Sequence, residues 1–239
     1  MAIHRIQPDV IPEGLTPKTK EVFKDVSNLE CIKGLVLCGG TAQSIQMNHR
    51  LSEDLDFELI GVRKERPQLD FKGIITEINK KFPGAQTELL GEEHFLMYIN
   101  DGTVKLSFFR PENPVKAFNE GYSMNNLKTP TLQELLGMKL YTLCVREKFR
   151  DYYDIYCLVN AGYKLKDAVD YASYLSRHTI RSKTMLTRLL SPHLFPKNSD
   201  FNKMNPKFDV APKQIMERCQ KAIIEENLGR KIQLSIPKF

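Results

Sequence analysis

The sequence predicts an α+β protein in which a mixed-sheet domain, residues 1–125, precedes a helical bundle domain, residues 126–239. Segments that alternate polar and apolar residues lie in the first part, as expected for strands with one buried face. Segments with apolar residues at helical spacing dominate after Pro111. With 41% hydrophobic and 27% charged residues among 239, the chain has a globular composition and enough length to bury a substantial core.

Helices and strands are expected to alternate in the first part. Thr16-Pro17 is typical of a helix start, with a capping side chain followed by proline at the first helical position. Gly39-Gly40 ends a short apolar strand, and Asn100-Asp101-Gly102 predicts a tight turn between two strands. The expected helices cover 17–27, 41–49 and 67–82, and the expected strands cover 35–38, 54–59, 86–90, 94–99 and 103–109.

The second part is expected to be helical. Its predicted helices cover 131–145, 151–161, 165–177, 179–190 and 212–228. The polar stretch 191–210 between the last two, rich in proline, asparagine and lysine, is expected to be a long loop.

The 35 Lys+Arg and 29 Asp+Glu residues are unevenly distributed. Residues 1–163 hold 20 basic and 22 acidic residues, whereas residues 164–239 hold 15 and 7. The basic last third predicts attraction to a polyanion such as nucleic acid, although a solvated helical face explains the charge equally well. No stretch approaches the ~20 apolar residues of a membrane span, and residues 1–10 lack the apolar core of a signal peptide. The five scattered cysteines suit a reducing compartment. The chain is therefore expected to be cytoplasmic, without a membrane partner.

Residues 39–56 contain the groups with the clearest chemistry. Asp54 and Asp56 are two apart on an expected strand, so both carboxylates leave one face, about 7 Å apart. Such a pair can bind Mg²⁺ or Mn²⁺ together with substrate phosphates, although an isolated Asp-x-Asp is more often a solvated strand face. Gly39 and Gly40 allow close backbone approach, and Thr41 adds a hydroxyl at a helix start that suits phosphate.

These motifs resemble the signature of the AbiEii/AbiGii toxin family, a branch of the nucleotidyltransferase superfamily. The resemblance rests on Gly39-Gly40-Thr41-Ala42, on residues 49–57, on Met138-Lys139-Leu140 and on residues 146–156. It implies a nucleotidyltransferase-like fold, transfer of an NMP group from an NTP to an acceptor for which tRNA is the best candidate, and a cognate antitoxin. The implied catalytic residues are Asp54, Asp56, Lys139 and Asp151, with Asp54 and Asp56 as metal ligands; the implied nucleotide contacts are Gly39, Gly40, Thr41, Arg50, Ser52 and Lys139.

Two of these residues have alternative roles on the sequence alone. Lys139 lies on an apolar helical stripe, so its ammonium must reach solvent, a phosphate, or a carboxylate of Asp151 or Asp154. The family resemblance favours phosphate, with Asp151 preferred as the residue that orients Lys139 or accepts a proton. Arg50 is expected either to contact a triphosphate or to cap a helix and pair with Glu53.

One departure from the superfamily pattern leaves two functions open. Nucleotidyltransferases usually carry a third carboxylate on the strand beside the Asp-x-Asp strand, where this chain presents Lys105 and Ser107. Glu58 is a possible substitute but lies about 14 Å along the strand from Asp54. The chain is therefore expected to be a metal-dependent nucleotidyltransferase, or else a catalytically degenerate fold that binds nucleotide or nucleic acid. His94 has no partner at ligand spacing and is expected to serve a surface or packing role.

Overall fold

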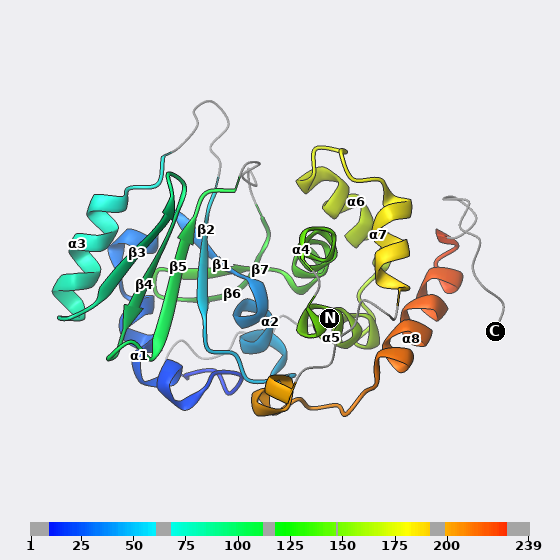
Figure 1. Ribbon diagram of the computed structural model, residues 1–239, viewed down its shortest axis with the longest axis horizontal. Coiled ribbons are helices and arrows are strands. Elements are labelled where there is room, and N and C mark those ends of the chain that lie inside the picture. The colour runs from blue at the N-terminus through cyan, green and yellow to red at the C-terminus, as the bar shows by residue number, and fades with distance from the viewer. Residues whose placement is uncertain (1–9, 61–67, 112–117, 147, 192–198, 229–239) are drawn as a thin grey trace. The chain divides into compact units, whose positions relative to one another are not determined.

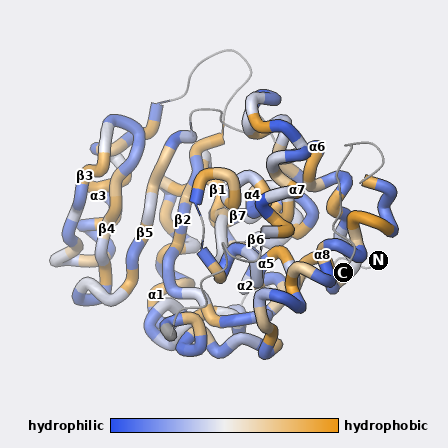
Figure 2. The backbone as a smooth tube through the Cα atoms, turned by 45° about the vertical axis from the view of Figure 1, so that its right-hand side comes forward, coloured by the Kyte–Doolittle hydropathy of each residue, from blue (hydrophilic) through white to orange (hydrophobic). Residues whose placement is uncertain are grey.

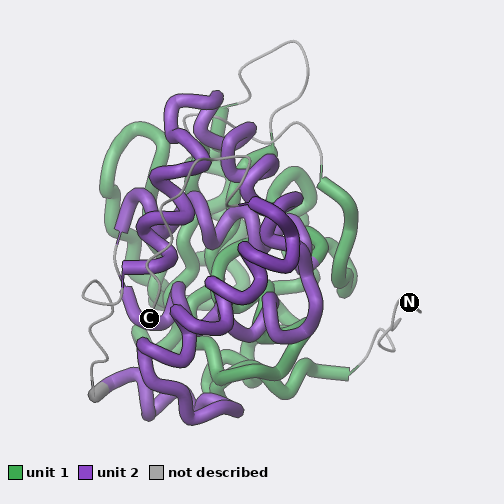
Figure 3. Tube along the Cα trace, turned by 90° about the vertical axis from the view of Figure 1, so that its right-hand side faces the viewer, with its two compact units in different colours: residues 1–131 green, residues 132–239 purple. Residues whose placement is uncertain are grey.

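The computed structural model describes residues 10–60, 68–111, 118–146, 148–191 and 199–228 (Figure 1). The fold is α+β, as predicted, with strands in the first part of the chain and helices in the second. The chain divides into two compact units, residues 1–131 and 132–239, shown in green and purple in Figure 3. The predicted domain boundary between residues 125 and 126 stays a prediction.

A five-stranded mixed sheet forms the centre of unit 1, in the order β1-β2-β5-β4-β3 (Figure 1). β1 (Leu35–Cys38) pairs antiparallel with β2 (Leu55–Leu59), which runs parallel to β5 (Val104–Phe109). β4 (His94–Ile99) then pairs antiparallel with β5 and with the edge strand β3 (Gln86–Gly91). All five strands lie where they were predicted, to within one residue at their ends.

Two of the three α-helices described in unit 1 begin at side-chain caps. Thr16 caps α1 (Pro17–Ser27), where its hydroxyl accepts from the backbone N–H of Thr19 at 3.4 Å. α2 (Gly39–Met47) follows β1 directly. α3 (Phe71–Lys81) begins later than predicted, because the Asp70 carboxylate accepts from the N–H of Gly73 and starts the helix there; Pro67 lies outside the described residues.

Two short elements of unit 1 were not predicted. β6 (Glu120–Met124) and β7 (Leu127–Pro130) form an antiparallel hairpin, and Glu30–Ile32 forms a single 3₁₀ turn. The hairpin turns at Asn125, whose φ of 53° lies in the left-handed region that asparagine tolerates. The adjacent asparagines at 125 and 126 were the available turn signal.

Aromatic side chains fill one face of the sheet. Phe57 of β2 stacks on Phe108 of β5 at 5.3 Å between ring centroids, and Phe108 stacks on Phe95 of β4 at 5.1 Å. Phe71 of α3 contacts Phe95 at 4.8 Å, so this helix covers the same face. Because side chains alternate along a strand, the neighbours of these phenylalanines point to the opposite face.

Unit 2 consists of helices built around α4 (Leu132–Val145), whose side chains at Leu135, Leu136, Leu140 and Leu143 are fully buried. Gly137 lets α6 approach closely, since a Cβ there would lie 2.7 Å from the Tyr171 ring. The other four helices of unit 2 are α5 (Phe149–Asn160), α6 (Leu165–Leu175), α7 (Ser182–Leu189) and α8 (Pro212–Glu225). All five helices begin and end within a few residues of the predicted positions. Hydrophobic and hydrophilic segments alternate along α8 in Figure 2.

The polar stretch expected to be a loop contains a short helix. Residues Ser199–Met204 form a 3₁₀ helix, while residues 192–198 lie outside the described part of the chain. Phe201 anchors this turn, with its ring centroid 4.7 Å from that of Phe149 and 4.9 Å from that of Tyr153. A buried aromatic residue thus anchors a turn within a mostly polar segment. Among the described residues, no helix is long and apolar enough to span a membrane.

Candidate active site

Asp54, directly before β2, and Asp56 within it lie on the face of the sheet opposite the aromatic core. Leu55 and Phe57 are fully buried, as predicted, so Asp54 and Asp56 project from the other side. The strand register places Asp56 beside Ser107 of β5. Ser107 therefore occupies the neighbouring position at which a third carboxylate was expected.

Lys105 brings a positive charge to the same face. Its ammonium lies 2.9 Å from a carboxylate oxygen of Asp54, with the two side chains 33% and 25% exposed. Because Lys105 and Ser107 alternate with the buried Leu106, both lie on the face opposite the aromatic core; Lys105 is partly exposed there, whereas Ser107 is buried. We call Asp54, Asp56, Lys105, Ser107 and His94 the acidic face.

His94 belongs to this face, a placement that sequence reasoning missed. Its Nε2 lies 3.0 Å from the Ser107 hydroxyl, and its ring packs edge-on against Phe109 at 5.8 Å. Partial burial lowers the pKa of His94 and outweighs the neighbouring Asp56 carboxylate, which raises it. The available signal was the hairpin register, which brings the start of β4 next to the end of β5.

The carboxylates of Asp54 and Asp56 fit a single hard cation. Carboxylate oxygens are the ligands that Mg²⁺ and Mn²⁺ prefer, and the Lys105 ammonium already occupies a cation position at Asp54. Gly39 has a φ of +70°, and a Cβ there would lie 3.1 Å from Asp56 Oδ2, so glycine leaves room beside this carboxylate. Among the described residues, no group of three His, Cys, Asp or Glu side chains could hold a metal, so substrate and water would complete the coordination.

Glu58 differs from the two aspartates in its environment. It lies further along β2 and is only 6% exposed. Burial raises the pKa of its carboxyl to about 7, so much of it is protonated near neutral pH. A protonated carboxyl is a poor metal ligand, which argues against Glu58 as the substitute for a third acid.

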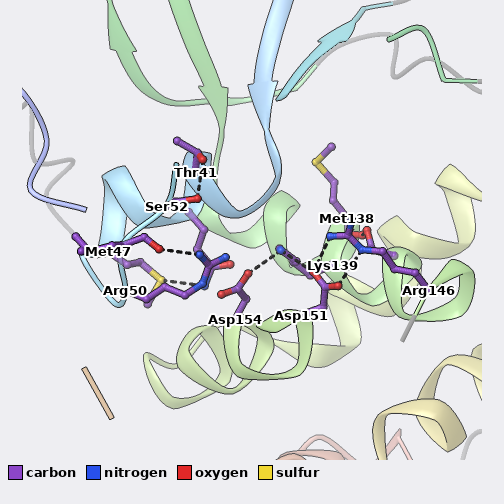
Figure 4. Close-up of polar contacts among 12 residues, drawn as sticks. Thr41, Met47, Arg50, Ser52, Met138, Lys139, Arg146, Asp151 and Asp154 are labelled. Atoms are coloured by element: carbon purple, nitrogen blue, oxygen red, sulfur yellow. Dashed lines mark hydrogen bonds and ion pairs between the residues drawn. The ribbon is translucent and has the colours of Figure 1, made fainter. Parts of the chain in front are cut away.

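Thr41 and Ser52 hold the segment that precedes β2 against the start of α2 (Figure 4). The Thr41 hydroxyl donates to the backbone carbonyl of Asp54 and lies 2.7 Å from the Ser52 hydroxyl, which must therefore donate to Thr41. The N–H of Ser52 donates to the carbonyl of Gly14 at 3.0 Å. Both hydroxyl protons are thus used within the protein and position Asp54; contact of these residues with nucleotide stays a prediction.

Arg50 packs against Gly40. Its side chain is nearly buried, and its Nη1 donates to the carbonyl of Leu51 at 3.0 Å. A Cβ on residue 40 would lie 2.3 Å from Arg50 Nη2. The close approach that glycine permits here is therefore made by a guanidinium at the first turn of α2, and a direct contact of Gly40 or Arg50 with phosphate stays a prediction.

Unit 2 contains a second charged group, formed by Lys139, Arg146, Asp151 and Asp154, which we call the ion cluster (Figure 4). The Lys139 ammonium lies 2.9 Å from Asp151 Oδ1 and 2.6 Å from Asp154 Oδ2. Arg146 donates from Nε and Nη2 to both oxygens of Asp151, at 3.0 and 3.1 Å. Of the partners considered for Lys139, the carboxylates are the ones observed within this unit; its predicted contact with phosphate stays a prediction.

The ionisation of Asp151 suits an orienting role. Burial alone would raise the pKa of its carboxyl, but the charges of Lys139 and Arg146 outweigh this and hold the pKa below its ordinary value. A carboxylate stabilised in its ionised form is a weak proton acceptor. The geometry therefore favours Asp151 as the residue that orients Lys139.

Comparison with known proteins places most of the chain in one family. A sequence model of the family described as "Nucleotidyl transferase AbiEii toxin, Type IV TA system" matches residues 24–228. An uncharacterized protein of Aquifex aeolicus is 27% identical over 154 residues, which cover 64% of this chain and 71% of that protein.

Two solved structures are similar at low identity. A putative nucleotidyltransferase from H. pylori aligns with a TM-score of 0.49 and 17% identity, covering 90% of this chain and 94% of its own. MenT4, a nucleotidyltransferase toxin of Mycobacterium tuberculosis, aligns with a TM-score of 0.48 and 13% identity, covering 87% of this chain and 84% of its own.

Proposed function

The chain belongs to the AbiEii family of nucleotidyl transferase toxins, and from that premise we propose that it transfers an NMP group from an NTP to an RNA acceptor in a metal-dependent reaction. The observation that carries the proposal is the pair Asp54 and Asp56 on one face of β2, beside the glycine at position 39. This pair offers oxygen ligands where a metal–nucleotide complex can approach the backbone closely.

The proposed reaction replaces a phosphoanhydride bond of the NTP with a phosphodiester bond to the acceptor. A hydroxyl oxygen of the acceptor bonds to the α-phosphorus of the NTP, the bond from that phosphorus to the bridging oxygen breaks, pyrophosphate leaves, and the hydroxyl proton passes to solvent. A bound Mg²⁺ or Mn²⁺ supplies positive charge for the phosphate oxygens. Asp54 and Asp56 hold that charge in place, and the hydrogen bonds of Thr41 and Ser52 keep Asp54 in position.

Charge supports nucleic acid as the acceptor, with tRNA the first candidate. Residues 164–239 carry 15 basic and 7 acidic residues, a surplus that attracts a phosphate backbone. A cognate antitoxin is proposed from the family description, which names a toxin–antitoxin system.

A transfer assay tests the proposal. The protein is incubated with each of the four NTPs labelled at the α-phosphorus, with Mg²⁺ or Mn²⁺ and with bulk small RNA. We expect label to reach RNA with one or more NTPs, and we expect Asp56→Asn to reduce the rate by about a thousandfold, the loss typical when a charge that stabilises the transition state is removed. Asp101→Asn is the matched control, because Asp101 is an exposed aspartate of the β4–β5 turn in the same unit.

Two results would contradict the proposal. Label transfer by Asp56→Asn at the rate of the control would show that the acidic face takes no part in the reaction. Metal-dependent nucleotide binding without any transfer, across all four NTPs and both metals, would favour a catalytically degenerate fold that only binds nucleotide. Ser107, at the position where a third carboxylate is usual, is consistent with that alternative.

A further inference from the structure

The acidic face already contains one positive charge. The Lys105 ammonium lies 2.9 Å from Asp54, and both groups are partly shielded from water, at 33% and 25% exposure. Ionic attraction at such a distance is stronger than on an open surface, because the effective dielectric constant is lower. The Lys105–Asp54 ion pair therefore contributes to the electrostatic potential of the acidic face.

Lys105 is fixed in position by its strand. Val104 and Leu106, its neighbours in β5, are buried at 1% and 0% exposure. β5 is also paired on both sides, with Leu106 beside Leu55 of β2 and Lys105 opposite Tyr98 of β4. The backbone of Lys105 consequently cannot move away from Asp54 without disrupting the centre of the sheet.

We infer that Lys105 supplies a fixed positive charge in place of one of the two metal ions of a two-metal site, so that the acidic face binds a single divalent cation. This inference rests on the proposed function, because it assumes that Asp54 and Asp56 hold the metal. Lys105 is a positioning residue in this account: it sets the charge of the face and the orientation of Asp54.

The balance of charges supports a single cation. Two carboxylates and one ammonium leave the face with one net negative charge, enough to attract one divalent ion that also contacts phosphate. The polar side chains that β5 and β4 add to this face are Ser107 and His94, which are 3.0 Å apart, and Tyr98, which lies opposite Lys105 and donates to Glu88 at 2.8 Å; none of the three is a carboxylate. Within the described residues, no third acid joins Asp54 and Asp56 in a metal-binding group.

The test counts bound metal and does not depend on turnover. Electron paramagnetic resonance measures Mn²⁺ bound by the full chain, alone and with an NTP analogue whose α–β bridge is a methylene group. We expect one Mn²⁺ in each wild-type complex with the analogue. We also expect Lys105→Met to bind free Mn²⁺ about tenfold more tightly, because one repelling unit charge a few ångströms away is removed.

Two control variants sharpen the result. Lys105→Arg keeps the charge and should bind free Mn²⁺ as the wild type does. Lys128→Met removes a lysine from a surface ion pair with Glu120 and should leave Mn²⁺ binding unchanged.

Two Mn²⁺ ions in each wild-type complex, or unchanged Mn²⁺ affinity in Lys105→Met, would overturn the inference. The wild-type count decides the matter even where Lys105→Met fails to fold. A wild type that binds one Mn²⁺ but transfers no label would contradict the proposed function and leave the inference on Lys105 standing. Label transfer by a wild type that binds two Mn²⁺ ions would support the proposed function and contradict the inference on Lys105.

Discussion

The acidic face of unit 1 and the ion cluster of unit 2 use the same types of side chain in opposite ways. In the ion cluster, Asp151 and Asp154 are fully buried and the two carboxylates face two cations. On the acidic face, the carboxylates of Asp54 and Asp56 are partly exposed, and the ammonium of Lys105 pairs with Asp54. A balanced set of charges with buried carboxylates links neighbouring helices, whereas an unbalanced set with accessible carboxylates can still bind a cation.

Lys139→Met is expected to have the largest effect on stability. It leaves Asp151 and Asp154 buried beside each other, with Arg146 as the remaining cation of the cluster. Removing one member of a buried ion pair typically lowers the free energy of unfolding by about 3–5 kcal/mol. Urea unfolding followed by circular dichroism measures the change.

Lys128→Met is the control for Lys139→Met. Lys128 pairs with Glu120 at 3.0 Å, but both side chains are about half exposed, at 51% and 45%. Its loss should change the free energy of unfolding by about 0–1 kcal/mol. Equal effects of the two substitutions would show that burial of the ion cluster does not distinguish it from a surface pair.

Glu58→Gln tests the one acid of β2 that the acidic face does not use. Burial raises the pKa of Glu58 from 4.5 to about 7, so ionisation costs stability as the pH rises through this window. Below pH 4.5 the carboxyl is protonated in both the folded and unfolded states, and the cost is absent. Glu58→Gln should therefore raise the free energy of unfolding by about 3 kcal/mol at pH 8 and leave it unchanged at pH 4.

Urea unfolding of wild type and Glu58→Gln across this pH range measures the difference. A constant difference between the two proteins from pH 4 to pH 8 would contradict a raised pKa for Glu58.

Thr41→Val is expected to have the smallest effect of the three. It removes the hydroxyl that joins Ser52 to the backbone of Asp54 and leaves a buried hydroxyl and a carbonyl without that partner. The expected loss is about 1–2 kcal/mol in the free energy of unfolding. Thr103→Val, which removes an exposed turn hydrogen bond to Asn100, is the matched control and should cost about 0.5 kcal/mol or less. A Thr41→Val protein as stable as this control would mean that the segment before β2 is held by other contacts.

The sequence predicted the elements that form the acidic face because strand periodicity and glycine positions are local signals. The period-two pattern placed Asp54 and Asp56 on one face, and β2 shows the predicted alternation from Leu55 to Phe57, whereas Glu58 is buried. The family resemblance and the enzyme class, a nucleotidyltransferase, are confirmed by the family match over residues 24–228.

Partners across the fold were less accessible to sequence reasoning. The position of His94 beside Ser107 depends on which strand follows which in the sheet, and the ion pair of Lys105 with Asp54 depends on the register of a parallel pair. Similarly, the Thr41 hydroxyl had several possible acceptors, and in the structure it donates to the backbone carbonyl of Asp54. Local patterns predict faces of elements, whereas strand order and register decide which side chains meet.

The most direct test of the contrast between the two regions is the metal dependence of nucleotide affinity. Binding of the methylene-bridged NTP analogue is measured by calorimetry with and without Mn²⁺, for wild type and for the double variant Asp54→Asn/Asp56→Asn. We expect Mn²⁺ to tighten binding to the wild type, and we expect this gain to disappear in the double variant while its thermal unfolding stays cooperative. An undiminished gain from Mn²⁺ in the folded double variant would contradict the assignment of the metal–nucleotide site to the acidic face.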